Sequence, residues 1–152
     1  MNLTWHALPY PDLSPDQLYA ILRLRAEVFV VEQDCAYQDL DDKDQRAIHV
    51  LGMTEDGRLA AYTRLLEKGI SYPAYASIGR VITAPFARGK GLGRPLMRVS
   101  LRLLFANFGG GQPVKISAQS HLQAYYQSVG FEPVGEGYLE DGIPHIGMVY
   151  RS

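Results

Sequence analysis

The stretch that decides the fold reads Ala76-Ser77-Ile78-Gly79-Arg80-Val81-Ile82-Thr83-Ala84-Pro85-Phe86-Ala87-Arg88-Gly89-Lys90-Gly91-Leu92-Gly93. Its first part, residues 76–84, is typical of a strand, which Pro85 ends because proline offers no donor to a sheet. After the glycine-rich hexapeptide 88–93, apolar residues recur at helical spacing on two faces as far as Phe108. We therefore predict a strand, a glycine-rich turn and a helix that is largely buried against a sheet.

The hexapeptide 88–93 has the features of an anion-binding turn. Unpaired backbone N–H groups and the positive end of the helix dipole converge at a helix start, which suits a phosphate or pyrophosphate. Glycine lets phosphate oxygens reach those amides, and Arg88, Lys90 and Arg94 add positive charge. The glycines at 89, 91 and 93 fit neither G-x-x-x-x-G-K-[ST] nor G-x-G-x-x-G, so the two common nucleotide loops are excluded.

The other elements are predicted outward from this stretch. A capping-box pattern at Ser14 and Gln17 predicts a first helix that runs to about Val28. A second pattern at Ser120 and Gln123 predicts a helix that Gly130 ends. Strands are predicted over residues 49–54, 59–66, 113–118, 131–139 and 146–151, with irregular segments at 32–44 and 67–75. The chain, residues 1–152, is thus expected to form one α/β domain with a mixed sheet and flanking helices.

Composition narrows the classes of function. The chain has 152 residues, 47% of them hydrophobic and 20% charged, and a net charge of −1, which argues against a nucleic-acid partner. One cysteine, Cys35, excludes an internal disulfide and any zinc site that needs two or more thiolates. The acidic residues 39–44 lack the glycine and the final glutamate of a calcium loop, so no metal is implied. No signal peptide and no apolar run of roughly 20 residues is present, so we expect a cytoplasmic protein without a membrane partner.

Two motifs resemble those of the GCN5-related N-acetyltransferases (GNAT). The pyrophosphate loop [QR]-x-x-G-x-[GA] of that family matches Arg88-x-x-Gly91-x-Gly93, and Tyr126-x-x-x-Gly130-Phe131 looks like its last helix and strand. A narrower resemblance to the ElaA-like branch lies in residues 25–41 and 140–148. The resemblance covers nearly the whole chain and implies a single-domain GNAT-like fold with a splayed pair of parallel strands.

The resemblance also implies a binding site for acetyl-CoA, with coenzyme A as product. The pantetheine amides would pair with the backbone of Val81, Ile82 and Thr83, and the pyrophosphate would lie on the amides of residues 89–93. The complete set of residues implied to bind the coenzyme is Val81, Ile82, Thr83, Arg88, Gly89, Lys90, Gly91, Leu92, Gly93, Arg94, Gln119 and Tyr126.

The activity implied is transfer of an acetyl group from acetyl-CoA to a primary amine of a small molecule or peptide, by direct attack. Tyr126, carried over from the family motif, is the candidate acid, and its neighbour Tyr125 favours core packing. No acid lies between residues 76 and 84, so the base must come from Glu32, His121, His145 or water.

Two other functions stay open. Arg25, Phe29, Glu32 and the aspartates that follow resemble the amino-terminal pattern of acyl-homoserine-lactone synthases, although the tryptophan of that pattern is missing. Some relatives of the GNAT family use a glutamate on the strand that corresponds to residues 76–84, and this chain has none there. Its absence leaves open a second function, that of a regulator that binds acyl-CoA without catalysis.

Several side chains remain to be placed by the fold. Arg25 is expected to pair with a carboxylate or carbonyl, since a buried charge needs a partner. The acidic run Asp39, Asp41, Asp42 and Asp44 favours a solvated face over an amine-attracting one. Cys35 is not expected to carry an acyl group. Tyrosine-rich loops fit either an acceptor cleft or a homodimer interface.

Overall fold

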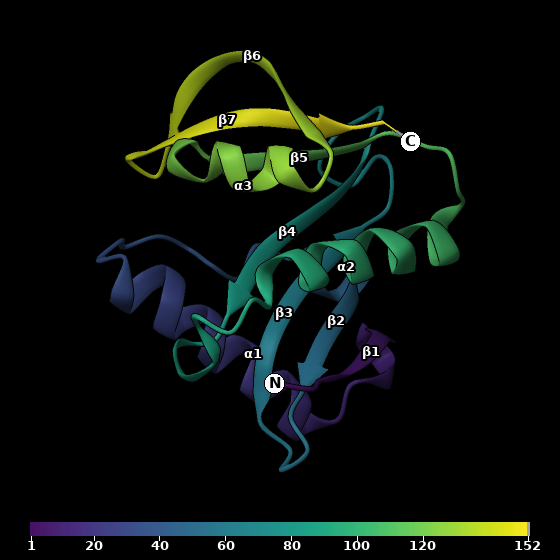
Figure 1. The fold of residues 1–152 in the computed structure, drawn as a ribbon, viewed down its shortest axis with the longest axis vertical. Helices are drawn as coiled ribbons and strands as arrows, with labels where there is room; N and C mark the ends of the chain where they lie inside the picture. Colours follow the sequence, from purple (N-terminus) through teal and green to yellow (C-terminus); the bar gives the residue numbers. More distant parts are fainter. Residues whose placement is uncertain (152) are drawn as a thin grey trace.

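A seven-stranded mixed sheet in the order β1-β2-β3-β4-β5-β7-β6 organises the computed structural model, which describes residues 1–151 (Figure 1). Helices α1 (Pro15–Arg25) and α2 (Gly93–Phe108) lie on opposite sides of the first half of this sheet, and the short α3 (Gln123–Ser128) lies against the second half. The strands are β1 Thr4–Pro9, β2 Ile48–Met53, β3 Leu59–Leu66, β4 Ala76–Thr83, β5 Val114–Gln119, β6 Phe131–Glu140 and β7 Ile143–Tyr150.

The two halves of the sheet meet at the parallel pair β4 and β5. These strands pair only at Ala76 with Val114 and at Ser77 with Lys115, and then diverge. On its other edge β4 continues to pair with β3 as far as Thr83. The predicted splayed pair is therefore confirmed, and the β5-facing edge of β4 is left without a neighbouring strand from residue 78 onward.

A bulge in β4 sets the direction of the residues that follow it. Arg80 has a positive φ of 51°, and two residues of β4 stand opposite one residue of β3 at this point. The extra residue reverses the alternation of side chains. As a result, Ile78 packs in the cluster beneath α2, while Ile82, four residues later, packs in the cluster beneath α1.

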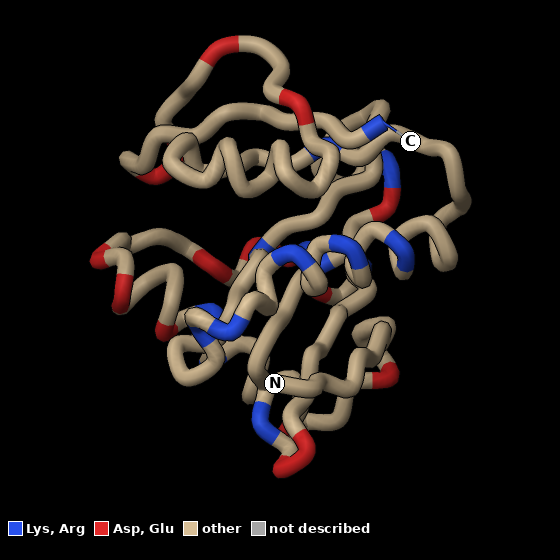
Figure 2. Tube along the Cα trace, in the orientation of Figure 1, with Lys and Arg blue, Asp and Glu red and all other residues tan. Residues whose placement is uncertain are grey.

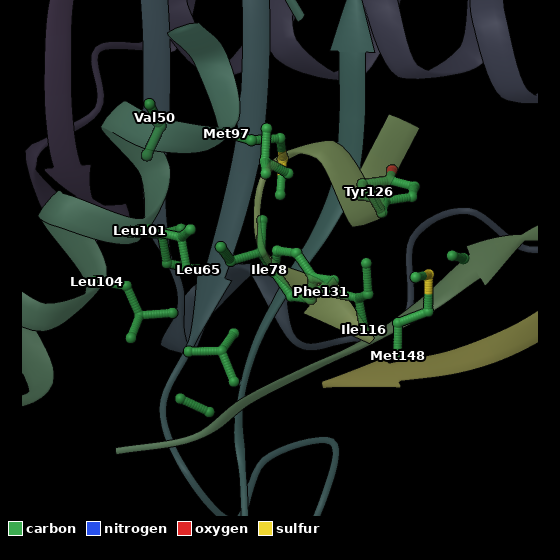
Figure 3. Packing of buried hydrophobic residues seen from close by; sticks show 14 residues of the cluster. Val50, Leu65, Ile78, Met97, Leu101, Leu104, Ile116, Tyr126, Phe131 and Met148 are labelled. Carbon is green, nitrogen blue, oxygen red and sulfur yellow. The ribbon is translucent and has the colours of Figure 1, made fainter. Parts of the chain in front are cut away.

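The larger core cluster joins the two halves of the sheet (Figure 3). Met97, Leu101 and Leu104 of α2 meet residues of β2, β3 and β4, and the same cluster continues to Phe131 and Met148. These side chains are at most 6% exposed. Ser100 is also buried on α2, and its hydroxyl donates a hydrogen bond to the Leu96 carbonyl oxygen, which satisfies its polar group inside the core.

The predicted start of the first helix is confirmed, whereas its predicted end and the predicted start of the last helix are wrong. The Ser14–Gln17 capping box is present, with hydrogen bonds of 2.8 and 3.1 Å. The α-helix ends at Arg25 instead of Val28, because the chain continues as a π-helical segment, Ala26–Glu32. The capping box predicted at Ser120 is wrong, since residues 120–122 form a 3₁₀ turn and α3 begins at Gln123 without a side-chain cap.

The strand predictions are correct in type, with shifts at the ends. The prediction missed β1, and the last strand begins three residues earlier than predicted, at Ile143. Both departures have a tertiary cause, because β1 gains its pairing from β2, and the extra residues of β7 pair with the end of β6.

The acidic run after α1 is not a solvated face, which corrects the favoured prediction. Asp39 and Asp44 are only 5% and 7% exposed, and both accept hydrogen bonds from the fully buried guanidinium of Arg25, at 2.9 and 2.7 Å. Arg64 of β3 donates a bidentate pair to Asp41, both at 2.8 Å, and a third bond to Asp44 at 3.0 Å. The expected partner for Arg25 is thus confirmed. Asp39, Asp41 and Asp44 are covered because the loop folds over the arginines of α1 and β3, whereas Asp42 stays exposed.

The same loop also holds the bulge of β4. The Arg80 guanidinium donates to the Asp39 carbonyl oxygen at 2.8 Å and forms ion pairs with the side chains of Asp39 (2.8 Å) and Asp41 (3.4 Å). The strained backbone at Arg80 is therefore held by the acidic loop, directly before the strand residues implied to bind the donor.

His49 lies next to this network, and its burial makes the stability of the fold depend on pH. Its side chain is fully buried, with Nε2 2.9 Å from the Asp44 carbonyl oxygen and Nδ1 2.7 Å from the Tyr62 hydroxyl. A carbonyl only accepts, so Nε2 carries the proton and Nδ1 accepts from Tyr62. Burial lowers the pKa of His49 below its ordinary value.

Below pH of about 6.5 the unfolded chain therefore binds a proton that the folded form resists, and stability falls as the pH drops. We expect a lower free energy of unfolding at pH 5.5 than at pH 7.5, measured by urea denaturation. His49→Gln should reduce this difference, whereas His6→Gln, at an exposed position of β1, should retain it. An undiminished difference in His49→Gln would remove His49 as its source.

Candidate active site

A cleft of about 890 Å³ opens where β4 and β5 diverge. Its walls come from residues 78–83 of β4, the facing part of β5, the π-helical segment with the loop after it, the start of α3, and the β6–β7 turn. Segments far apart in the sequence thus share one cavity. The cleft brings together nine of the residues predicted for the site, namely Glu32, Val81, Ile82, Thr83, Arg88, Gly93, Gln119, Tyr126 and His145.

One wall of the cleft is the free edge of β4. Val81, Ile82 and Thr83 line the cleft beyond the last β4–β5 pair, so their main chain faces a space that no strand fills. Gln119 lies across from them at the end of β5, where its amide nitrogen donates to the side-chain oxygen of Gln33 at 3.4 Å. Backbone donors and acceptors on such an edge can add an extended ligand as they would a further strand.

The glycine-rich turn borders the cleft through Arg88 and Gly93, whereas Gly89, Gly91 and Leu92 do not line it. Gly89 and Gly91 have positive φ values of 74° and 72°, and an added Cβ at either position would have no atom within 4 Å. No side chain caps the start of α2. The buried side chain of Leu92 packs on Ala60 and Ala87 and so anchors the turn by its apolar side. The amides of the turn are thus left open to an anion.

The basic side chains of the turn differ in their partners. Arg88 forms a bidentate pair with Glu32, at 2.7 and 3.0 Å. This hydrogen bonding lowers the pKa of Glu32, which weakens it as a proton acceptor. The Arg94 Nε donates to the Ser128 hydroxyl at 3.1 Å and ties α2 to the end of α3. Lys90 and Arg94 do not line the cleft.

The two adjacent tyrosines of α3 have different surroundings. The Tyr125 hydroxyl donates to the Gly93 carbonyl oxygen at 2.7 Å, and burial raises the pKa of Tyr125 to about 12. Tyr126 is 6% exposed and packs edge-on against Phe131, with ring centroids 6.1 Å apart. Its hydroxyl bonds to none of residues 1–151 and points away from the apolar cluster (Figure 3). Burial raises the pKa of Tyr126, so this hydroxyl is protonated at neutral pH.

His145 of β7 lines the cleft beside the end of β6. Its Nδ1 donates to the Ile143 carbonyl oxygen at 2.7 Å, which leaves the lone pair on Nε2. That Nε2 lies 3.4 Å from Glu140 Oε2, and the ring stacks on Tyr138 with centroids 6.3 Å apart. The residue is 7% exposed, so it lies deep in the cleft. His121 also lines the cleft but is exposed.

Cys35 and possible metal ligands are the remaining groups to consider. The Cys35 thiol lines the cleft and donates to the Asp141 carbonyl oxygen at 3.5 Å. Within residues 1–151, no three His, Cys, Asp or Glu side chains are grouped so as to hold a metal ion. None of the helices in that range has the length and apolar character to cross a membrane.

Comparison with known proteins identifies the family. A model described as "Acetyltransferase (GNAT) domain" matches residues 10–152, which is nearly the whole chain. The chain belongs to the GNAT family. Protein ElaA of Escherichia coli K12 is 46% identical over 148 residues, and the match covers 96% of this chain and 95% of that protein. The predicted relation to the ElaA-like branch is confirmed.

Solved structures of GNAT relatives confirm the fold. An acyl-CoA N-acyltransferase from Pseudomonas aeruginosa superimposes with a TM-score of 0.90 at 45% identity, covering 98% of this chain and 99% of that one. Escherichia coli ElaA gives a TM-score of 0.89 at 45% identity, with the same coverage. The CoA-dependent acyl-homoserine lactone synthase BjaI gives 0.80 at 18% identity, covering 99% of this chain and 83% of that one, which shows a shared fold alone.

The GNAT family uses acyl-CoA, and the residues of this chain fit such a donor. The free edge of β4 offers main-chain donors and acceptors, and the turn before α2 offers uncapped amides without an obstructing Cβ. Basic residues occur along α2, at the positions that Figure 2 shows in blue. Acyl-CoA carries amides and a pyrophosphate along one extended chain. Its amides complement the free edge of β4, and its pyrophosphate complements the turn that follows.

Some cleft residues were missed by the sequence prediction. The sequence places Arg80 in a strand and predicts no role for it in the cleft, which it lines. A lone arginine among apolar strand residues is nevertheless a signal for a buried partner. Ser117 of β5 and Glu140 and Asp141 of the β6–β7 turn were not given roles, yet all three line the cleft. Their place depends on how the last hairpin folds back over β5.

Proposed function

We propose that the protein is an N-acetyltransferase that moves an acetyl group from acetyl-CoA to a primary amine of a small molecule or peptide by direct attack. The observation that carries this proposal is the divergence of β4 and β5 next to a glycine turn, with the Tyr126 side chain lining the cleft. Among residues 1–151, no side chain caps the start of α2 and none bonds to the Tyr126 hydroxyl. Because the family's donor is a cytoplasmic metabolite and Cys35 is a free thiol, we propose that the reaction takes place in the cytoplasm.

The donor side of the cleft would hold acetyl-CoA chiefly through the main chain. Val81, Ile82 and Thr83 would pair with its amides, while the amides of residues 89–93 would hold its pyrophosphate. Arg88, Lys90 and Arg94 add positive charge near that turn, and Gln119 faces the donor strand from β5. Acetyl-CoA supplies a thioester carbonyl that a neutral amine can attack, with a thiol as the leaving group.

Tyr126 and His145 supply the proton transfers in this proposal. The protonated Tyr126 hydroxyl would donate to the departing sulfur, and the lone pair on His145 Nε2 would accept the proton of the attacking amine. His145 is a better supported base than Glu32, because Arg88 occupies both carboxylate oxygens of Glu32. Direct attack needs no acyl-enzyme at Cys35, whose side chain has no histidine or cationic partner within residues 1–151.

Calorimetric titration with acetyl-CoA tests the donor site. Gly91→Glu would place a carboxylate, on a backbone that favours glycine, where the pyrophosphate is proposed to lie. We expect micromolar binding to the wild type and at least a hundredfold loss in Gly91→Glu, with circular dichroism unchanged. Gly110→Glu, beyond α2 in open space and without a positive φ, is the matched control and should bind like the wild type.

Failure of the wild type to bind acetyl-CoA would contradict the donor site. Equal affinity in the wild type and Gly91→Glu would place the pyrophosphate elsewhere. Tight binding without transfer to any amine would favour a regulator that only binds acyl-CoA.

A further inference from the structure

The positive charges that line the cleft are all compensated by neighbouring acids. Arg80 pairs with Asp39 and Asp41, and Arg88 pairs with Glu32. Arg80 belongs to the buried network of three arginines and three aspartates, which is neutral as a whole. These pairs therefore leave no net positive charge on the acceptor side.

Two acids of the cleft have no such compensation. Glu140 accepts from the Ser117 hydroxyl at 3.2 Å and lies 3.4 Å from His145 Nε2, and neither Glu140 nor Asp141 forms an ion pair with a Lys or Arg among residues 1–151. Lys115 of β5 does not line the cleft, because its ammonium lies over the Tyr72 and Tyr75 rings, at 5.0 and 5.6 Å. The β6–β7 end of the cleft thus carries a net negative charge.

The groups on this wall are ordered by depth. Tyr126 and His145 are 6% and 7% exposed, whereas the Glu140 side chain is 50% exposed and Asp141 lies at the rim. The Tyr126 side chain is buried apart from the part that lines the cleft, and its hydroxyl has no partner within residues 1–151, which marks the inner end as a place for a ligand, independently of the acids. Figure 2 shows acidic positions at the β6–β7 turn and on the segment after α1.

We infer that the acceptor is a diamine, whose reacting nitrogen reaches Tyr126 and His145 while a second, positively charged nitrogen lies at the rim near Glu140 and Asp141. This inference rests on the proposed function and names its acceptor class. A cation at the rim gains from two uncompensated carboxylates in a partly shielded cleft, and a carboxylate there would be repelled.

Three acceptors that differ only at the far end test the inference. The compounds 1,5-diaminopentane, hexylamine and 6-aminohexanoate share one aminoalkyl chain and end in an ammonium, a methyl group and a carboxylate. Release of coenzyme A thiol gives kcat/KM for each. We expect the diamine to exceed hexylamine by about tenfold, which corresponds to one charge-assisted interaction, and 6-aminohexanoate to be the poorest. The preference should shrink as salt is raised from 50 to 500 mM, because salt screens exposed charges.

Asp141→Asn is the matched variant, because asparagine tolerates the positive φ of 49° at this position and removes only the charge. We expect it to lower the ratio of diamine to hexylamine about threefold. The ratio is measured within one preparation, so a loss of folded protein does not affect it. Glu136→Gln, on an exposed part of β6 that does not line the cleft, should retain the wild-type ratio.

Equal kcat/KM for the diamine and hexylamine, a preference for 6-aminohexanoate, or an unchanged ratio in Asp141→Asn would each overturn the inference. Absence of transfer to the diamine would overturn it as well. The acetyl-CoA titration is independent of the acceptor, so a protein that binds the donor at the β4 turn but rejects the diamine refutes the acceptor class alone.

Discussion

Asp44→Asn is expected to lower the free energy of unfolding by about 3 kcal/mol, because it removes the carboxylate shared by two buried arginines. Arg25 is fully buried and Arg64 is 3% exposed, so neither guanidinium can regain water without opening the loop. Burial itself works to raise the pKa of Asp44, but the hydrogen bonds from Arg25 and Arg64 outweigh it and hold the pKa below its ordinary value. Urea denaturation at pH 7 measures the loss.

Asp42→Asn is the matched control, because it removes the same charge from the same loop. Asp42 is exposed, forms no ion pair with any of residues 1–151, and has a positive φ of 63° that asparagine accepts. We expect a change below about 0.5 kcal/mol. Equal effects of the two substitutions would show that the loop contributes little, and the bulge at Arg80 would then need another source of support.

Tyr126→Phe is expected to lower kcat about thirtyfold while the affinity for acetyl-CoA changes less than about twofold. The substitution keeps the ring packed against Phe131 and removes only the hydroxyl that faces the cleft. The expected effect is smaller than the roughly 10²-fold minimum that is usual for a general acid, because a thiol leaves readily without a proton donor. Steady-state rates with 1,5-diaminopentane, together with titration of acetyl-CoA, separate turnover from binding.

Tyr125→Phe provides a neighbouring comparison. Its hydroxyl bonds to the Gly93 carbonyl oxygen at 2.7 Å, so its loss should lower stability by about 1 kcal/mol. We expect a smaller effect on kcat than in Tyr126→Phe. An unchanged kcat in Tyr126→Phe would remove Tyr126 from the chemistry and leave it as a core residue.

The strand, turn and helix of the proposed donor half could be predicted from sequence because their information is local. The turn at Gly89 and Gly91 needs positive φ, and the strand before it and the helix after it follow from residue patterns within one short stretch. The resemblance to the GNAT motifs then implied the divergence of β4 and β5, which residue patterns alone do not encode.

The buried ion network could not be predicted, because its partners are distant in the chain. Asp44 pairs with arginines 19 and 20 residues away, on α1 and on β3. A run of acids has the same composition whether it faces water or covers arginines. The local sequence therefore favours the commoner arrangement, in which the acids face water. The isolated arginines at 25, 64 and 80, each among apolar residues, were the available signal.

The proposed acceptor half of the site could not be predicted from the sequence, for a related reason. Residues 140 and 141 reach the cleft only because β7 pairs with both β5 and β6, and because the register of the last hairpin shifts between Val134 and Tyr138. A shift of one residue would turn Glu140 to the other face of the sheet. Sequence patterns indicate such a hairpin but not its register.

The central claim is direct transfer of acetyl from acetyl-CoA to an amine, and mass spectrometry after mixing the protein with isotope-labelled acetyl-CoA tests it most directly. With 1,5-diaminopentane present, we predict one released coenzyme A thiol for each labelled acetyl-diamine, with the mass of the protein unchanged. Without the amine, the protein should bind the donor and gain no acetyl group. A labelled acetyl on Cys35 that is passed on to the amine, or donor binding with no amine acetylated, would contradict the account.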